Sequence, residues 1–225
     1  YLEEDVVPEI LQMALNFTMK RFPAFATTVK RGIFWHYLDG TRRHYPIELE
    51  EYTALSPIKI SHSRSMTFRV LFFQKRISVE FFHILADGRG GMTFLKTLVN
   101  EYLRLLGHKI TYEGQIFDVD ETPKDEEFHN DFPPLKLSKK VEKSKLNQGV
   151  QIRGKLARVR PCEILHFDFS SQKILEVAKA NQVSVTVLMI AFLARAISRS
   201  TKEKRGTVNL QIPIDLRRFF NPNTL

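Results

Sequence analysis

The sequence of 225 residues contains a single cysteine, Cys162. One thiol excludes a disulfide framework, and it also excludes a zinc site built from cysteines alone. It fits a reducing compartment, and we expect a cytoplasmic protein. Glycine and proline are sparse as well, at 10 residues each, which excludes collagen-like and low-complexity architectures.

Long apolar runs are also lacking. The longest covers residues 187–194 and ends at Arg195, well short of the roughly 18–20 apolar residues that a membrane helix needs. We therefore expect no membrane span. The first five residues are acidic and have no signal-peptide pattern. Because the chain has no initiator methionine and ends in a loop-like segment, we expect a piece of a longer protein.

Positive charge is in excess, with 34 Lys and Arg against 25 Asp and Glu. Most of the excess lies in residues 136–160, where nine Lys or Arg and one Glu give about +8. Residues 118–131, with seven acids and one Lys, carry about −6. Adjacent runs of opposite sign are typical of solvated loops, and no zinc-finger, RNA-recognition or basic-zipper signature accompanies them. We expect no nucleic-acid partner.

Helices and strands alternate irregularly, which indicates an α/β or α+β class. The 3.6-residue period of apolar side chains predicts helices over residues 8–22, 92–106, 172–181 and 185–199, the last of them the more buried. Asp5, Ser170 and Ser184 are the expected N-caps, and Pro23 and Gly107 the expected ends.

Runs of β-branched and aromatic residues predict strands over residues 27–37, 66–73, 77–82, 164–169 and 208–214. Asp39-Gly40 is typical of a turn. The polar, proline-containing residues 113–160 are expected to connect two halves of the chain. The many phenylalanines of the strands are most simply core.

The most informative stretch is a strand, then His83, a glycine-rich turn and a helix. A neutral imidazole at a strand end can accept a proton near physiological pH. Asp87 lies four residues later, and we expect Gly88, Gly90 and Gly91 to allow positive φ. From the pattern alone, a hydrogen-bonded core histidine is an alternative for His83.

Other chemistries find little support in the sequence. A further alternative is that His83 and Asp87 are metal ligands. Two ligands cannot complete a metal site, so we expect no metal. The glycine-rich turn lacks the Gly-Lys-Ser/Thr ending of a phosphate loop, and no Gly-x-Ser-x-Gly elbow is present. Cys162 is more simply a small buried apolar residue than a nucleophile.

The six residues from His83 to Gly88, HILADG, resemble the HxxxDG motif of the superfamily typified by chloramphenicol acetyltransferase. That superfamily includes acyl-CoA-dependent acyltransferases and the condensation domains of nonribosomal peptide synthetases. Residues 20–25, 184–188 and 212–217 also resemble its first helix and the elements after its halfway crossover. The resemblance spans nearly the whole chain and is strongest to bacterial alcohol-acetyltransferase-like proteins.

The resemblance implies an α/β fold, a two-lobed CoA-dependent acyltransferase sandwich. In that fold, residues 1–120 would form the N-terminal lobe with the HxxxDG loop. Residues 121–160 would form a polar crossover linker, and residues 161–225 the beginning of the second lobe. The chain would then be the first lobe and the start of the second.

The resemblance also implies roles for single residues. His83 would lie in a channel between the lobes and act as general base on a hydroxyl or amine acceptor. The acceptor would attack acyl-CoA, such as acetyl-CoA, a co-substrate and not a permanently bound cofactor. Asp87 would turn away from the substrate and pair with an arginine, either Arg217, which we favour, or Arg218. Gly88 would let the loop turn.

Two alternatives to acyl-CoA-dependent catalysis stay open. A condensation-type domain would use thioesters of an acyl carrier protein, but Phe82 stands where such domains usually carry a second histidine. A non-catalytic binding module of the same fold is the other. The basic residues 136–160 either form a solvated loop or attract a negatively charged partner, which would be the phosphates of CoA or an acidic carrier protein.

Overall fold

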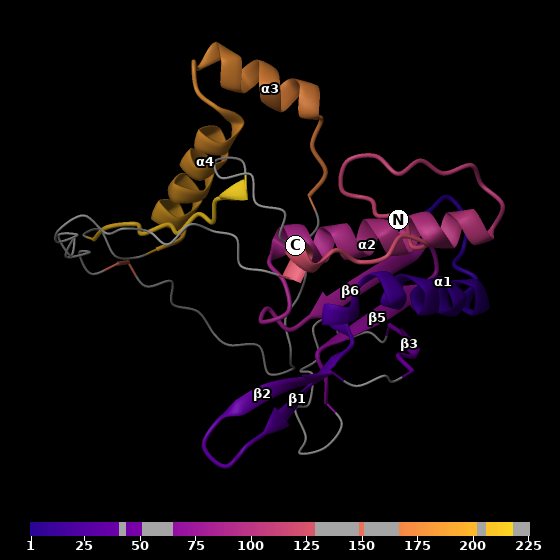
Figure 1. The fold of residues 1–225 in the computed structure, drawn as a ribbon. Coiled ribbons are helices and arrows are strands. Elements are labelled where there is room, and N and C mark those ends of the chain that lie inside the picture. The colour runs from indigo at the N-terminus through magenta and orange to yellow at the C-terminus, as the bar shows by residue number, and fades with distance from the viewer. Residues whose placement is uncertain (41–43, 51–64, 129–148, 151–166, 202–205, 218–225) are drawn as a thin grey trace. The chain divides into compact units, whose positions relative to one another are not determined.

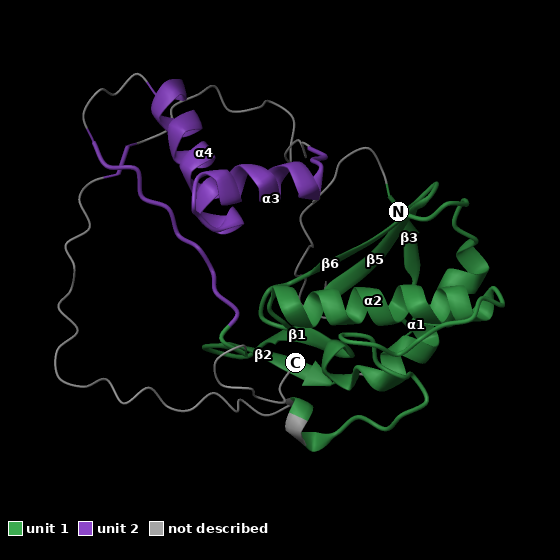
Figure 2. Cartoon of the chain, turned by 90° about the horizontal axis from the view of Figure 1, so that it is seen from above, with its two compact units in different colours: residues 1–133, 160–162, 216–225 green, residues 134–159, 163–215 purple. Residues whose placement is uncertain are grey.

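The structure is a computed structural model that describes residues 1–40, 44–50, 65–128, 149–150, 167–201 and 206–217 (Figure 1). The chain divides into two compact units (Figure 2). Unit 1 comprises Tyr1–Pro133, Arg160–Cys162 and Leu216–Leu225, and unit 2 comprises Pro134–Val159 and Glu163–Asp215. The described residues form a mixed α/β fold, as expected. The assignment of residues 1–120 and 161–225 to acyltransferase lobes stays a prediction.

Helix α1 covers Pro8–Arg21, and its range was predicted within one residue. Its N-cap is Val7, which makes no side-chain cap, so the expectation for Asp5 was wrong. The Val7 N–H instead donates to the Tyr102 hydroxyl at 3.0 Å. This bond ties the start of α1 to another helix and replaces the local cap.

The first sheet has the strand order β2-β1-β4, with β1 at Thr27–Arg31, β2 at His36–Gly40 and β4 at Ser65–Met66. The single strand expected over residues 27–37 is therefore two strands of a hairpin. The chain reverses at residues 32–35, where the Gly32 N–H donates to the Trp35 carbonyl at 2.6 Å. The turn expected at Asp39-Gly40 was wrong, because both residues pair with β1.

The second sheet has the order β3-β5-β6, with β3 at Ile47–Leu49, β5 at Phe68–Phe73 and β6 at Arg76–Phe81. β5 and β6 form an antiparallel hairpin, close to the two strands predicted. Thr67 interrupts the first of those, since the chain passes there from the sheet of β4 to the sheet of β5. β3 was not predicted, because three residues are too few to establish an alternation.

Helix α2 covers Gly88–Leu105 and so begins four residues before the predicted Met92. Gly88, Gly90 and Gly91 are helical and are not among the glycines with positive φ, so that expectation was wrong. The cause is Asp87, whose side chain caps the helix and starts it early. Gly107, with φ of +91°, follows the end of the helix as predicted.

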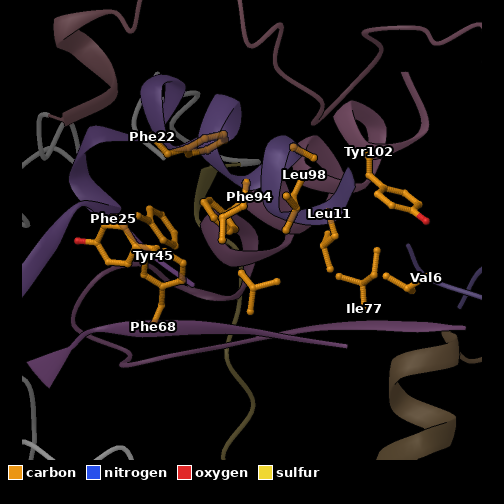
Figure 3. Close-up of a cluster of buried hydrophobic side chains, with 13 residues drawn as sticks. Val6, Leu11, Phe22, Phe25, Tyr45, Phe68, Ile77, Phe94, Leu98 and Tyr102 are labelled. Atoms are coloured by element: carbon orange, nitrogen blue, oxygen red, sulfur yellow. The ribbon is translucent and has the colours of Figure 1, made fainter. Parts of the chain in front are cut away.

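The core of unit 1 lies between helices α1 and α2 and the sheet of β5 and β6 (Figure 3). Phe94 of α2 is at its centre, stacked on Phe25 with ring centroids 4.5 Å apart. The rings of Phe22 and Phe68 meet Phe94 edge-on at 5.2 and 5.4 Å. Such pairs add about 0.5–1.5 kcal/mol each beyond area burial. The prediction that the phenylalanines of the strands are core residues is correct for Phe68 but wrong for Phe34, Phe73 and Phe82, which are exposed.

Unit 2 contains helices α3, Ser171–Ala180, and α4, Val185–Ser200. Both ranges were predicted, and Ser170 and Ser184 cap them as expected. Each helix has one buried residue, Ala178 in α3 and Leu188 in α4, so α4 does not stand out as the more buried helix that the sequence predicted. An apolar helix is buried only where other elements cover it, which periodicity cannot show. Among the described residues, no single helix has the length and hydropathy of a membrane span; α3 and α4 meet that test only as a pair bent by 88°.

The strand expected over residues 208–214 is absent, and the described part of the one expected over 164–169 is not a strand either. In this region Thr207 forms an isolated bridge with Gly149. Apolar alternation makes a strand only where a neighbouring strand supplies hydrogen bonds. Cys162 and all nine Lys and Arg of residues 136–160 lie outside the described residues.

Candidate active site

His83 lies on a tight turn immediately after β6. The Phe82 N–H donates to the Thr67 carbonyl at 2.7 Å, which extends the pairing of β6 by one residue. The Leu85 N–H then donates to the Phe82 carbonyl at 2.9 Å and closes the turn around His83. The backbone is therefore fixed on both sides of this histidine.

The side chain of His83 is exposed. Within the part of the chain that the structure describes, no residue forms a hydrogen bond or ion pair with its imidazole. The alternative of a satisfied core histidine was therefore wrong. An exposed imidazole on a fixed backbone is available to a substrate, whereas the expected channel between two lobes stays a prediction.

Asp87 is the N-cap of α2. Its Oδ1 accepts hydrogen bonds from the Arg89 N–H at 3.0 Å and from the Gly90 N–H at 2.9 Å. The first N–H groups of a helix have no partners within the helix, and a carboxylate satisfies them while also complementing the helix dipole. Asp87 thus sets the point at which the loop after His83 becomes helix.

The other carboxylate oxygen of Asp87 binds Arg217, whose Nη1 donates to Oδ2 at 2.5 Å. The arginine side chain is 7% exposed, whereas that of Asp87 is 47% exposed. Both residues belong to unit 1, although 130 positions separate them in the sequence. The expected pairing is present with Arg217; the alternative, Arg218, lies outside the described residues.

The pKa of Asp87 is lowered below its ordinary value of 3.8. Burial alone would raise this pKa, because it disfavours the charged form. The hydrogen bond from Arg217, the positive charge of that guanidinium and the bonds from the Gly90 and Arg89 amides together outweigh the burial. The carboxylate is therefore ionised at neutral pH and already bonded to the helix and to Arg217, which suits a structural role better than proton transfer.

The glycines after Asp87 do not form the turn that was expected of them. A Cβ on Gly88 would meet no atom within 4 Å, so the prediction that this residue needs glycine to turn the loop was wrong. A Cβ on Gly91 would lie 2.2 Å from two atoms of the Phe81 ring. Gly91 therefore permits close packing between the first turn of α2 and the end of β6, the two elements that flank His83.

Thr67 is the other supporting residue that sequence reasoning missed. It is 1% exposed, and its hydroxyl donates to the Thr27 carbonyl at 2.9 Å while its own carbonyl receives the Phe82 N–H. A threonine between two apolar strands gives no signal of this junction. The Gly90-Gly91 pair did give a signal, that of a close backbone approach, but it was interpreted as a turn.

Metal binding finds no support in the described part of the chain, where no group of three or more His, Cys, Asp or Glu could hold an ion. A groove of about 430 Å³ lies beside α2 and is lined by Leu95, Val99, Leu103 and Ile116, among others. His83, Asp87 and Arg217 do not line it, so the groove is separate from this site.

Comparison with known proteins adds little. No family model and no curated protein matches the chain. A solved structure, the SgcC5 protein from Streptomyces globisporus in complex with (R)-(-)-1-(2-naphthyl)-1,2-ethanediol and sucrose, matches at 16% identity with a TM-score of 0.38. The match covers 50% of this chain but 30% of that chain. At this TM-score the likeness carries no argument.

Proposed function

We propose that this chain is part of an acyltransferase that moves an acyl group from acyl-CoA to a hydroxyl or amine acceptor, with His83 as general base. The observation that carries the proposal is a division of labour within HILADG. Asp87 is held by α2 and Arg217, while His83 is exposed and unbonded among the described residues. The Asp87 side chain fixes the loop, and the His83 side chain is left to react with a substrate.

The reaction needs a base because an alcohol is too weak an acid to ionise beforehand. The neutral imidazole of His83 takes the acceptor's proton while the acceptor oxygen or nitrogen attacks the thioester carbonyl. The carbon–sulfur bond then breaks, and the same proton goes to the CoA sulfur, which leaves as the thiol. A positioned base of this kind contributes about 10²–10⁴-fold to the rate.

The contacts that hold the loop around His83 support this role. Phe82 is bonded to Thr67, and Gly91 packs against Phe81, so the loop is held between two elements of the core. Positioning matters because misplacement by about 1 Å can cost about 10²-fold in rate. The two-lobed sandwich, with His83 reached from a channel between lobes, is the architecture that this proposal requires.

The test measures release of the CoA thiol from acetyl-CoA in the presence of a panel of alcohols and amines. It is run with the purified chain and with the longest natural protein that contains this chain. We expect His83→Ala to lower the rate about 10²-fold or more. His108→Ala is the matched control, because His108 is another exposed histidine of unit 1 and lies outside the loop. It should leave the rate unchanged.

Full turnover in His83→Ala contradicts the proposal. Turnover with acyl carrier protein thioesters but not with acyl-CoA supports the condensation-type alternative. Binding of acyl-CoA without turnover, equal in the unmodified chain and in His83→Ala, supports a non-catalytic module. The donor panel therefore separates the three functions in one set of measurements.

A further inference from the structure

The hairpin of β1 and β2 carries three large apolar side chains at its tip. Ile33 is 85% exposed, Phe34 is 89% exposed and Trp35 is 62% exposed. Figure 1 shows the hairpin extending from unit 1 on the side away from α1 and α2. Exposed apolar side chains that follow one another in this way mark a contact surface more often than single exposed ones do.

The tip is a formed turn. The Gly32 N–H donates to the Trp35 carbonyl at 2.6 Å. A Cβ on Gly32 would lie 3.1 Å from that carbonyl oxygen and 3.4 Å from the indole nitrogen, so glycine lets Trp35 fold over the turn. Ile33 and Phe34 then occupy the apex of a hydrogen-bonded reversal.

The chemical character of the side chains changes step by step from the tip of the hairpin towards its base. Behind the apolar apex comes Trp35, and then Arg31, which is paired with His36. The next pair is Lys30 with Tyr37. The Lys30 ammonium forms an ion pair with Asp39, and Tyr37 is 46% exposed. A strand advances about 3.3 Å per residue, which puts Arg31 roughly 7 Å behind the apex.

This order matches the layers of a bilayer surface. Apolar side chains enter the acyl region, and Trp and Tyr are enriched at the boundary, where one end of the ring is wet. Lys and Arg side chains attract anionic headgroups. Peripheral elements bury their apolar face about 5–10 Å deep, which agrees with the spacing between Ile33 and Arg31.

We propose that the β1–β2 tip inserts into the surface of a bilayer that contains anionic lipids. The side chains of the tip are largely exposed, so they do not enclose a small ligand. A deformable acyl layer accepts an apolar wedge without a complementary pocket, and Arg31 behind the wedge favours a negative surface. The contact is peripheral and needs no spanning helix, and it holds whether or not the chain transfers acyl groups.

The chain contains a single tryptophan, Trp35 at the tip itself, so its fluorescence reports the contact directly. We expect the emission to shift to the blue when vesicles of phosphatidylcholine with phosphatidylglycerol are added. Vesicles of phosphatidylcholine alone should give a weaker response. Added salt should weaken binding to the anionic vesicles, because it screens Arg31.

Two variants at the tip sharpen the test. Phe34→Ser should weaken sedimentation with anionic vesicles about tenfold or more, because it removes the aromatic side chain that enters the acyl layer. Phe34→Leu should retain most of the binding. Met13→Ser is the matched control, since Met13 is 47% exposed on α1 and lies off the hairpin; it should bind as the unmodified chain does.

Three results would overturn the inference. The first is a Trp35 emission that anionic vesicles leave unchanged. The second is equal vesicle binding by Phe34→Ser and the unmodified chain when circular dichroism shows both folded. The third is a blue shift that appears without lipid and grows with protein concentration, because the tip then packs against a second copy of the chain.

Discussion

Phe94 and Phe192 both lie on helices whose first turn has a side-chain cap, yet one is buried and the other exposed. Phe94 on α2 is fully buried and touches the rings of Phe22, Phe25 and Phe68. Phe192 on α4 is 53% exposed. The period of a helix is a local property, and it predicted both helices. The cap of α4 at Ser184 was predicted too, whereas the cap of α2 at Asp87 was not. Burial depends on which elements cover the helix, and the local pattern contains nothing about that.

The largest expected effect is that of Phe94→Ala. Truncation of a buried phenylalanine costs about 3–5 kcal/mol in the free energy of unfolding. Phe192→Ala should change the same quantity by no more than about 0.5 kcal/mol, because the side chain is mostly in water. Urea unfolding followed by circular dichroism measures both.

If the two variants lose stability equally, α4 is as well covered as α2 and the comparison fails. If Phe94→Ala does not fold, Phe94→Leu gives a smaller loss of the same origin and keeps the test available. The expected order of the losses is then Phe94→Ala, Phe94→Leu and Phe192→Ala.

The second effect concerns the glycines of α2. Gly91→Ala should lower the free energy of unfolding by about 1–3 kcal/mol, because its Cβ would overlap the Phe81 ring. Gly88→Ala is the matched control, and it should be neutral or slightly stabilising, since alanine is the better helix former and nothing lies within 4 Å. Thermal unfolding of the two variants measures this difference in stability. Equal losses of stability in both would show that Gly91 is not a packing residue.

The third and smallest effect compares the caps of the two regions. Asp87→Ala on α2 should cost about 1 kcal/mol at neutral pH, and Ser184→Ala on α4 a similar amount. The ion pair with Arg217 adds little to the Asp87 value, because the half-exposed carboxylate is screened by water.

The two caps differ in their response to acid. The pKa of Asp87 is lowered in the folded chain, so its stabilising contribution is complete above its ordinary pKa of 3.8. The contribution is lost as the pH falls through the lower folded-state value. Ser184 does not titrate, so its cap should be independent of pH. Urea unfolding over a series of pH values checks this, and a loss from Asp87→Ala that persists in strong acid would contradict it.

Local features of the fold were predictable because their causes are local. Pro8 marks the start of a helix because its φ is fixed, and Gly107 marks the end of one because glycine tolerates a positive φ. Ser170 and Ser184 cap by reaching amides three residues away. The turn at Gly32 was missed because the residues around it all favour strands, and the reversal depends on pairing between β1 and β2. The strand expected over residues 208–214 failed for the same reason, since its apolar alternation cannot indicate a partner.

The site was predictable in outline. The motif indicated His83 and Asp87, and the resemblance pointed across 130 positions to Arg217. The supports could not be found in this way. Thr67 acts through its backbone carbonyl, which every residue possesses, and the contact of Gly91 with Phe81 depends on the angle at which α2 meets β6.

The central claim is that the His83 imidazole lies where the acyl donor binds, and its chemical modification tests this without knowledge of the acceptor. Diethylpyrocarbonate should modify both His83 and His108 in the free chain, because both are exposed. Acetyl-CoA should then protect His83 and leave His108 reactive, as read by mass spectrometry of the peptides. Modification of His83 that acetyl-CoA leaves unchanged would contradict the account.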